Sequence, residues 1–310
     1  MSTDALLWTI FGALVAGMLV LDLGVFHRRA RVIGFKEAAV WCAVWMALAL
    51  GFAGLVAHYR GEEQALQFVT GYLIEESLSA DNLFVFLLVF SYFAVPATYR
   101  HVVLLWGILG ALVLRAVCIV AGVALLQKFQ WVIYIFGGIL IYSGVKMALA
   151  KGQTVSPEKN PVLKLVRRLL PVTPEYVAGK FFVRRDGRTW VTPLLLVVVV
   201  VETMDLVFAV DSIPAVLAIS QDRLIVYTSN IFAVLGLRAL FFAVQGALSL
   251  FHYLHYGLCV ILMLIGAKML LAGWFHIPTG LTLGIVAGVL AVAVAASLIW
   301  PGKKDQTLLA

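Results

Sequence analysis

The sequence contains one stretch that decides the fold, Thr192-Pro-Leu-Leu-Leu-Val-Val-Val-Val-Val-Glu202-Thr-Met-Asp205-Leu-Val-Phe-Ala-Val-Asp211-Ser-Ile-Pro214-Ala-Val-Leu-Ala-Ile219. As a helix rising about 1.5 Å per residue, it is long enough to cross the roughly 30 Å hydrocarbon core of a bilayer. Earlier in the chain, Glu75 and Asp81 repeat the spacing of Asp205 and Asp211. Acidic side chains inside a membrane helix are costly, so they indicate a functional site.

The composition is that of a membrane protein. Hydrophobic residues make up 63% of the chain, charged residues make up 13%, and the mean hydropathy is +1.02, unlike a soluble globular domain. Apolar runs of about 20 residues predict about nine membrane helices, at residues 5–26, 37–58, 67–93, 102–126, 131–150, 192–219, 224–247, 256–275 and 279–299. The expected fold class is all-α, a polytopic membrane helix bundle.

The basic residues predict the orientation of the chain through the positive-inside rule. The basic cluster in residues 28–36 follows the first apolar run. A signal peptide carries its positive charge in front, so we expect this run to be a retained helix. With the N-terminus outside and the C-terminus cytoplasmic, most loop charges lie inside, and the outer loops hold Arg60, Lys128 and Arg223. The net charge of +7 then reflects a basic inner face and indicates no nucleic-acid partner.

Two segments of the chain repeat. The run from Gly107 to Ala116 aligns without gaps on the run from Asn230 to Ala239, and Gly144-Val-Lys-Met147 matches Gly266-Ala-Lys-Met269. Each repeat has three predicted spans, an odd number, so the second enters the membrane in the opposite orientation, as inverted repeats of secondary transporters do. The expected domains are two N-terminal helices (1–62), repeat 1 (63–150), a basic cytoplasmic linker (151–191), repeat 2 (192–275), and a last helix with a cytoplasmic tail (276–310).

The linker is rich in proline and basic residues. It holds nine Lys or Arg residues between Lys151 and Arg188, together with a turn-like segment at 185–188. A short amphipathic stretch from Val162 to Leu170 is expected to lie on the lipid surface. A regulatory or partner-binding role of the linker stays open.

The acidic motifs fit one shared site only if their helices are irregular. Six residues of a regular helix turn through about 600°, so Glu75 and Asp81 would point about 120° apart. Pro214 removes the backbone donor that would bond Val210. Near Glu75, three polar side chains can compete with the backbone ladder: Ser77, Ser79 and Asn82. We therefore expect a break or bend in both helices, which would free carbonyl oxygens as ligands.

Charges within the predicted spans do not balance. Seven acids lie within or at the edges of spans: Asp22, Glu75, Glu76, Asp81, Glu202, Asp205 and Asp211. The bases are Arg115, Arg238, Lys146 and Lys268. A charge at mid-bilayer costs on the order of 3 kcal/mol, so these groups must be paired, protonated, hydrated or metal-bound. The excess of acids suits a divalent cation and a proton, but salt bridges without a transported ion remain an alternative, above all for Arg115 and Arg238.

The donor types narrow the ion. The motifs offer carboxylates, hydroxyls and the Asn82 amide without histidine or cysteine, which favours magnesium, calcium or manganese over zinc or copper. Met204 adds a softer donor if it faces the site, and otherwise packs in the core. Asp22 either joins the site or approaches the inner headgroups. Cys42, Cys118 and Cys259 stand singly, so we expect no disulfide framework.

At three motifs the chain resembles the TerC family of integral membrane proteins, in particular its Alx-like branch. They are Leu21-Asp22-Leu-Gly-Val-Phe-His-Arg28, Glu75-Glu-Ser-Leu-Ser-Ala-Asp81-Asn82-Leu-Phe84 and Asp205-Leu-Val-Phe-Ala-Val-Asp211-Ser-Ile-Pro-Ala215. The resemblance implies a bacterial inner-membrane protein that exports manganese, with family links to tellurite resistance and alkaline pH. It places the ion at Glu75, Asp81, Glu202, Asp205 and Asp211. Possible accessory residues are Asp22, Asn82, Met204, Arg115 and Arg238.

Two classes of function remain. One is a secondary transporter that exports divalent ions, most simply manganese, and can exchange them for protons. The other is a nontransporting membrane module that assists metal loading of exported or membrane proteins, or stress resistance. An enzyme is not expected, because the sequence shows no nucleophile with a suitably spaced base, no glycine-rich phosphate loop and no ATP-binding domain. No resident cofactor is expected, and the bilayer, manganese and protons are the expected partners.

Overall fold

The computed structural model describes residues 3–26, 34–149, 160–185, 187–246, 253–275 and 277–299. Within these ranges it does not describe the side chains of 22–26, 80, 81, 84, 185 and 244–246.

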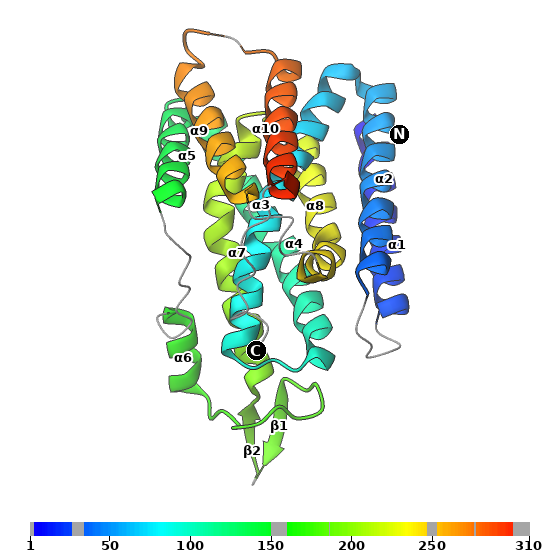
Figure 1. Cartoon of the computed structure of the whole chain (residues 1–310), viewed down its shortest axis with the longest axis vertical. Helices are drawn as coiled ribbons and strands as arrows, with labels where there is room; N and C mark the ends of the chain where they lie inside the picture. The colour runs from blue at the N-terminus through cyan, green and yellow to red at the C-terminus, as the bar shows by residue number, and fades with distance from the viewer. Residues whose placement is uncertain are drawn as a thin grey trace.

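Long helices fill the described part of the chain (Figure 1). They are α1 (Thr3–Phe26), α2 (Phe35–Arg60), α3 (Glu62–Tyr92), α4 (Ala97–Lys128), α5 (Val132–Leu149), α7 (Pro193–Leu217), α8 (Arg223–Gly246), α9 (Leu254–Leu271) and α10 (Thr279–Ile299). Each coincides with a predicted span. Eight of the described helices are long and apolar enough to cross a membrane, and α3, with 31 residues, carries the first acidic motif. The all-α membrane bundle is confirmed.

The helices α3, α4, α7 and α8 pack against one another at the centre of the bundle. Helix α3 packs on α8, α4 packs on α7, and α4 also packs on α8. Helices α5 and α9 form a close pair at one side of the bundle, and α1 and α2 lie at the opposite side (Figure 1). The two acidic motifs, on α3 and α7, are therefore held in the interior between these flanks.

Glycines allow α5 and α9 to approach closely. A Cβ on Gly144 would lie 2.9 Å from the backbone oxygen of Cys259, and a Cβ on Gly266 would lie 2.7 Å from that of Gly137. Both distances are too short for a real side chain. The two contacts are equivalent, because Gly144 aligns with Gly266 and Gly137 with Cys259 in the repeats.

The expected break in the acidic helices is wrong for the described backbone. Helices α3 and α7 run without interruption through both motifs. Ser77 donates its hydroxyl hydrogen to the Leu73 carbonyl at 2.5 Å, so its polar group is satisfied inside the helix and does not open it. Pro214 stands in the last turn of α7, which ends at Leu217, where losing one backbone hydrogen bond does little harm.

The linker contains a small folded unit. The sequence predicted its amphipathic stretch at 162–170 but not its sheet. Helix α6 (Pro161–Leu169) precedes a two-stranded antiparallel sheet of β1 (Phe182–Arg185) and β2 (Arg188–Val191). Tyr176 ties this unit to the bundle by donating its hydroxyl hydrogen to the Phe93 carbonyl at 2.8 Å. Burial raises the pKa of Tyr176 to about 12, so this donor stays protonated over the physiological range.

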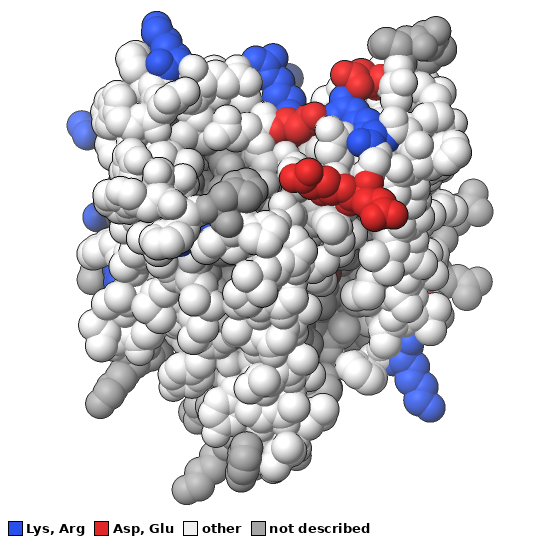
Figure 2. All heavy atoms as spheres, turned by 90° about the horizontal axis from the view of Figure 1, so that it is seen from above, with Lys and Arg blue, Asp and Glu red and all other residues white. Residues whose placement is uncertain are grey.

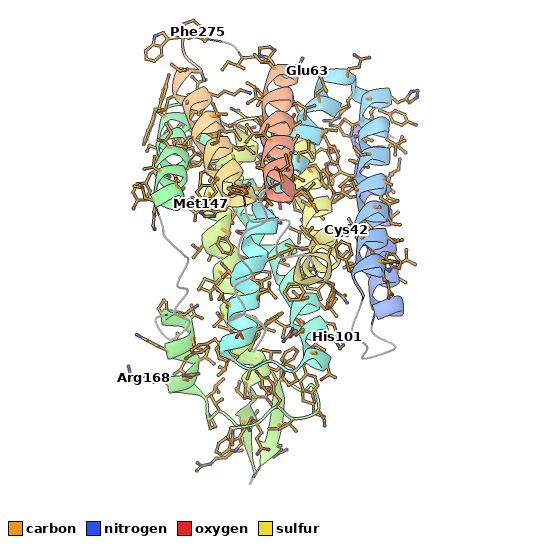
Figure 3. The ribbon with its side chains drawn as sticks, in the orientation of Figure 1. Cys42, Glu63, His101, Met147, Arg168 and Phe275 are labelled. Carbon is orange, nitrogen blue, oxygen red and sulfur yellow. The ribbon has the colours of Figure 1, made fainter. Side chains whose placement is uncertain are left out.

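The two ends of the bundle differ. Figure 3 places Glu63 and Phe275 at one end and Arg168, on α6, towards the other. Figure 2 shows the Glu63 end of the bundle from above. Acidic side chains lie beside basic ones on one part of this end, and most of the surface in this view is uncharged. There Arg60, at the end of α2, forms ion pairs with Asp4 of α1 and with Asp222, the latter at 2.5 Å. These pairs join the N-terminal helices to the α7–α8 connection.

Candidate ion site

The centre of the candidate site is Arg115 of α4, which is fully buried. Its guanidinium donates to both carboxylate oxygens of Asp205 on α7, at 2.9 and 3.2 Å. It also donates to Glu75 on α3 and, at 3.1 Å, to the Asn230 amide oxygen on α8. Four helices therefore meet at one side chain, and carboxylates from both repeats share one cation.

This pairing has a large energetic weight. Glu75 is fully buried and Asp205 is 4% exposed, so both charges lie where water screens little. A two-pronged guanidinium–carboxylate contact is among the stronger hydrogen-bonded pairs. Removing one partner from a buried pair leaves an uncompensated charge and typically costs about 3–5 kcal/mol. Arg115 thus fulfils the pairing role that the sequence left open for it.

Glu202 lies one helical turn before Asp205 and packs against α4. A Cβ on Gly110 would come within 2.1 Å of the Glu202 carboxylate. The absent side chain at Gly110 therefore makes the room that this carboxylate occupies. Both Glu202 carboxylate oxygens are buried without a hydrogen-bond partner among the described atoms. Such a group requires a proton, a water molecule or a cation.

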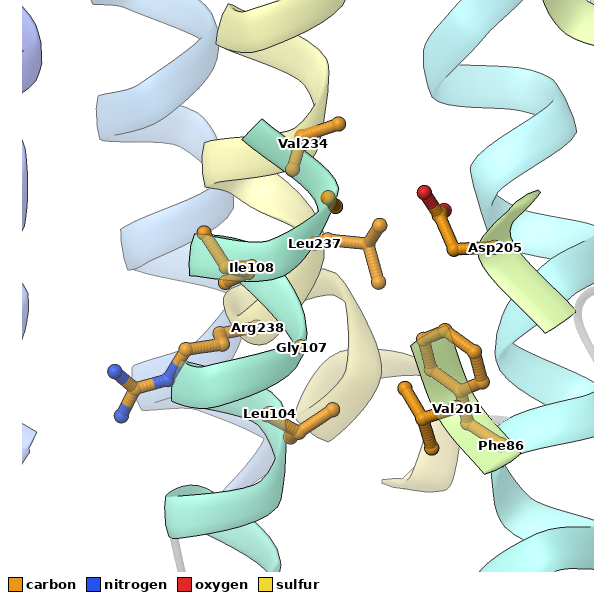
Figure 4. A pocket seen from close by; sticks show the side chains of 10 residues that line it. Phe86, Leu104, Gly107, Ile108, Val201, Asp205, Val234, Leu237 and Arg238 are labelled. Atoms are coloured by element: carbon orange, nitrogen blue, oxygen red, sulfur yellow. The ribbon is translucent and has the colours of Figure 1, made fainter. Parts of the chain in front are cut away.

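A small cavity adjoins Asp205. Its volume is about 20 Å³, and residues of α3, α4, α7 and α8 line it, including Phe86, Gly107, Val201 and Leu237. That volume suits roughly one water molecule. Arg238 also belongs to the lining, but its guanidinium points away from Asp205 (Figure 4). The polar end of the cavity is therefore formed by Asp205.

Asp211 faces a different neighbour. Its carboxylate accepts a hydrogen bond from the Ser143 hydroxyl of α5 at 2.6 Å. Asp205 and Asp211 are six residues apart on an unbroken helix, which corresponds to about 9 Å along the axis. The structure therefore separates Asp211 from the Arg115 network, and a single compact site containing both is not seen in the described residues.

Glu76 is also directed away from its neighbour Glu75. Its carboxylate oxygens lie 3.7 Å from the Cβ position of Gly236 on α8, close to Trp45 of α2. The resemblance did not place the ion at Glu76, and the structure places the Glu76 carboxylate beside α8.

The other predicted residues have mixed positions. Asn82 is buried at 7% exposure. Met204 is partly buried and packs against the apolar cluster around Val200 and Val201, the core-packing alternative. The side chains of Asp22 and Asp81 lie outside the described residues. Among the side chains that are described, no three of His, Cys, Asp and Glu are grouped closely enough to hold a metal ion.

The sequence analysis missed three contributors. Asn230 was quoted as part of the repeat, but its contact with Arg115 depends on how α8 faces α4. Ser143 gave no signal, because a lone serine in an apolar helix is common. Gly110 also lies in the repeated segment, where it aligns with Ala233. This pair of small residues was the sequence signal that a small residue is needed at Gly110.

Comparison with known proteins gives a consistent family assignment. The model of the integral membrane protein TerC family matches residues 60–306. A membrane protein from Myxococcus xanthus is 50% identical over 293 residues, covering 94% of this chain and 92% of its own length.

Two further relatives bear the name Alx and are described as proposed membrane-bound redox modulators. The Salmonella typhi protein is 44% identical over 314 residues, covering 98% of each chain. The Escherichia coli K12 protein is 46% identical over 296 residues, covering 93% of this chain and 92% of its own. No solved structure matches the chain. The protein with these motifs and this helix bundle belongs to the TerC family of multi-pass integral membrane proteins.

Proposed function

We propose that this protein is a secondary transporter that exports divalent metal ions, manganese in particular, across the bacterial inner membrane in exchange for protons. The observation that carries the proposal is the buried pairing of Glu75 and Asp205 with Arg115, together with the buried, unpartnered carboxylate of Glu202 one helical turn from Asp205. Buried carboxylates inside a membrane bundle are typical of ion and proton pathways. Their oxygen donors suit manganese, magnesium or calcium, and the family resemblance favours manganese.

The charges support a specific exchange of cations. When all are ionised, the three carboxylates Glu75, Glu202 and Asp205 outweigh the one guanidinium of Arg115 by two formal charges. A divalent cation would balance this excess. In the arrangement described here, Arg115 holds Glu75 and Asp205 together as a tethered cation. We propose that an entering metal competes with the guanidinium for these two carboxylates, and that protons replace the metal after release.

The packing of the bundle supports inverted repeats. Exchanging α3 with α7, α4 with α8, and α5 with α9 converts the α3–α8 contact into the α7–α4 contact and leaves α5–α9 unchanged. The reciprocal glycine contacts of Gly144 and Gly266 obey the same exchange. Such a two-fold arrangement, with the N-terminus outside as the basic loops predict, suits alternating access to a site between the repeats.

The alternative is a nontransporting membrane module that assists metal loading of exported or membrane proteins or stress resistance, or that acts as a redox modulator. The names of the Alx relatives describe membrane-bound redox modulators, which favours the redox form of this alternative. In this chain Cys42, Cys118 and Cys259 lie on three different helices and form no disulfide bond with one another. The described geometry therefore lends more support to ion binding by carboxylates than to a dithiol reaction.

Growth under excess manganese tests the proposal in cells. A strain without a manganese exporter should grow again when it expresses this chain, and Asp205→Asn should abolish this protection. The amide keeps the shape but removes one of the charges that would balance a divalent ion. Asp222→Asn, at the distant Arg60 pair, is the matched control and should protect. Protection by Asp205→Asn at normal membrane levels would contradict the role of this carboxylate.

A further inference from the structure

Helix α6 is a well-defined element at the end of the bundle away from Glu63. The Asn160 side chain caps it by accepting hydrogen bonds from the backbone of Val162 and Leu163, at 2.9 and 3.2 Å. Pro161 occupies the first turn, where its missing backbone donor costs nothing. Because both features fix the start of the helix, the faces of its two turns are fixed as well.

Only part of the apolar face of α6 is covered by α7. Leu163 is 1% exposed and, with Val166, packs in the apolar cluster that contains Leu194 and Val197 of α7. Beside these anchors, Val162, Leu165 and Leu169 are 40%, 54% and 68% exposed. One apolar stripe therefore anchors α6 to α7, and an adjacent one faces outward.

The rest of the α6 surface is basic. Lys164, Arg167 and Arg168 are all exposed, and Figure 3 shows Arg168 at the edge of the molecule. On a helical projection at about 100° per residue, Lys164 and Arg168 lie opposite the anchors, and Arg168 borders the exposed apolar stripe. Arg167 lies on the other side of the helix, next to the anchor Leu163. The described side chains of the following segment add Lys180, Arg184 and Arg188, against one acid, Glu175.

We propose that α6 is a docking surface for anionic phospholipids. Val162, Leu165 and Leu169 enter the boundary between headgroups and acyl chains, and Lys164 and Arg168 bind lipid phosphates. Exposed apolar side chains next to basic ones are the pattern of helices that bind anionic membrane surfaces, and basic residues near such a surface are attracted to its negative charge. With the orientation proposed above, this surface lies at the cytoplasmic leaflet.

Charge decides between this occupant and the others. A second copy would bring the same basic residues against themselves, because a two-fold contact joins identical patches. A purely apolar partner would leave Lys164 and Arg168 without opposite charges to bind. An anionic bilayer surface can bury the apolar stripe and also bind the basic side chains. Helix α6 is already held beside the bundle by its contacts with α7.

The test places a polarity-sensitive dye on the exposed stripe. Leu165→Cys is labelled in a chain whose Cys42, Cys118 and Cys259 are replaced by alanine, and the full-length protein is inserted into nanodiscs. Discs of phosphatidylcholine are compared with discs that also contain phosphatidylglycerol. We expect a blue shift of the dye emission that is larger with phosphatidylglycerol and decreases with added salt.

Two triple variants separate the role of α6 from that of general charge. Lys164→Gln/Arg167→Gln/Arg168→Gln should lose the lipid-dependent shift. Lys180→Gln/Arg184→Gln/Arg188→Gln removes the same charge from the neighbouring segment and should keep it. Both variants are first checked for a single symmetric elution peak, which shows that the bundle is folded.

Four outcomes would overturn the proposal. The dye emission could remain that of water in both kinds of disc. The two triple variants could lose the emission shift equally, which would show that the shift depends on the total positive charge of this end of the bundle and not on α6. Finally, the dye could become buried in detergent as protein concentration rises, which would identify a second copy as the occupant. Free inorganic phosphate that abolishes the shift at constant ionic strength would likewise indicate a phosphate site without a lipid surface.

Discussion

Arg115 shows how one residue can organise a site built from two halves of a chain. Its guanidinium binds Glu75 of the first repeat and Asp205 of the second. The sequence indicated that a buried base must pair with buried acids, because isolated charges in a bilayer are costly. The sequence could not indicate which acids pair with Arg115, because the pairing depends on the rotation of each helix about its axis.

Arg115→Gln should destabilise the protein, and manganese should restore its stability. The variant leaves Glu75 and Asp205 without their cation, at a cost of about 3–5 kcal/mol. A metal that takes the place of the guanidinium stabilises the folded state by mass action. Thermal unfolding in detergent, with and without manganese, measures both effects. Arg60→Gln, in the outer ion pairs, is the control, and equal stabilisation of both variants by manganese would contradict the site.

Gly110→Ala should impair transport by moving Glu202. The new Cβ would lie 2.1 Å from the Glu202 carboxylate, so the carboxylate must move. Gly138→Ala is the matched control, since no atom lies within 4 Å of its Cβ position. Manganese efflux from cells should fall with Gly110→Ala and stay normal with Gly138→Ala. Equal efflux in the two variants would remove Glu202 from the mechanism.

At the scale of elements, hydropathy predicted the helices well and their regularity poorly. The spans expected at 67–93 and 192–219 correspond to α3 and α7, because long apolar runs have few alternatives in a bilayer. The predicted breaks are not seen, since Ser77 bonds within its own helix and Pro214 stands at a helix end. The β1–β2 hairpin was missed, because its strands have only four residues each.

The α5–α9 contact yields a prediction about symmetry. Gly144→Ala and Gly266→Ala should each lower stability by a similar amount, about 1–3 kcal/mol, because each adds a Cβ against a backbone oxygen of the partner helix. Denaturation in detergent checks this, with Gly138→Ala again as the neutral control. Strongly unequal effects would argue against equivalent positions in two repeats.

At the scale of the whole molecule, the pH should control how tightly metal is held. Carboxylates must lose their protons before they ligate a cation, so manganese affinity should rise from mildly acidic to alkaline pH. The acidic side of the membrane would then favour release of the metal and uptake of protons. Titration calorimetry of the purified protein over a pH series measures this. A constant affinity would remove the argument for proton coupling at these carboxylates.

The central claim is export of manganese through the carboxylates around Arg115, and flux in proteoliposomes tests it most directly. Purified protein is reconstituted in vesicles with manganese on one side and a proton gradient across the membrane. The account predicts manganese movement driven by the gradient, a counter-movement of protons, and loss of both in Asp205→Asn. Manganese binding without movement by the wild-type protein, under either direction of the gradient, would contradict transport and favour the metal-loading module.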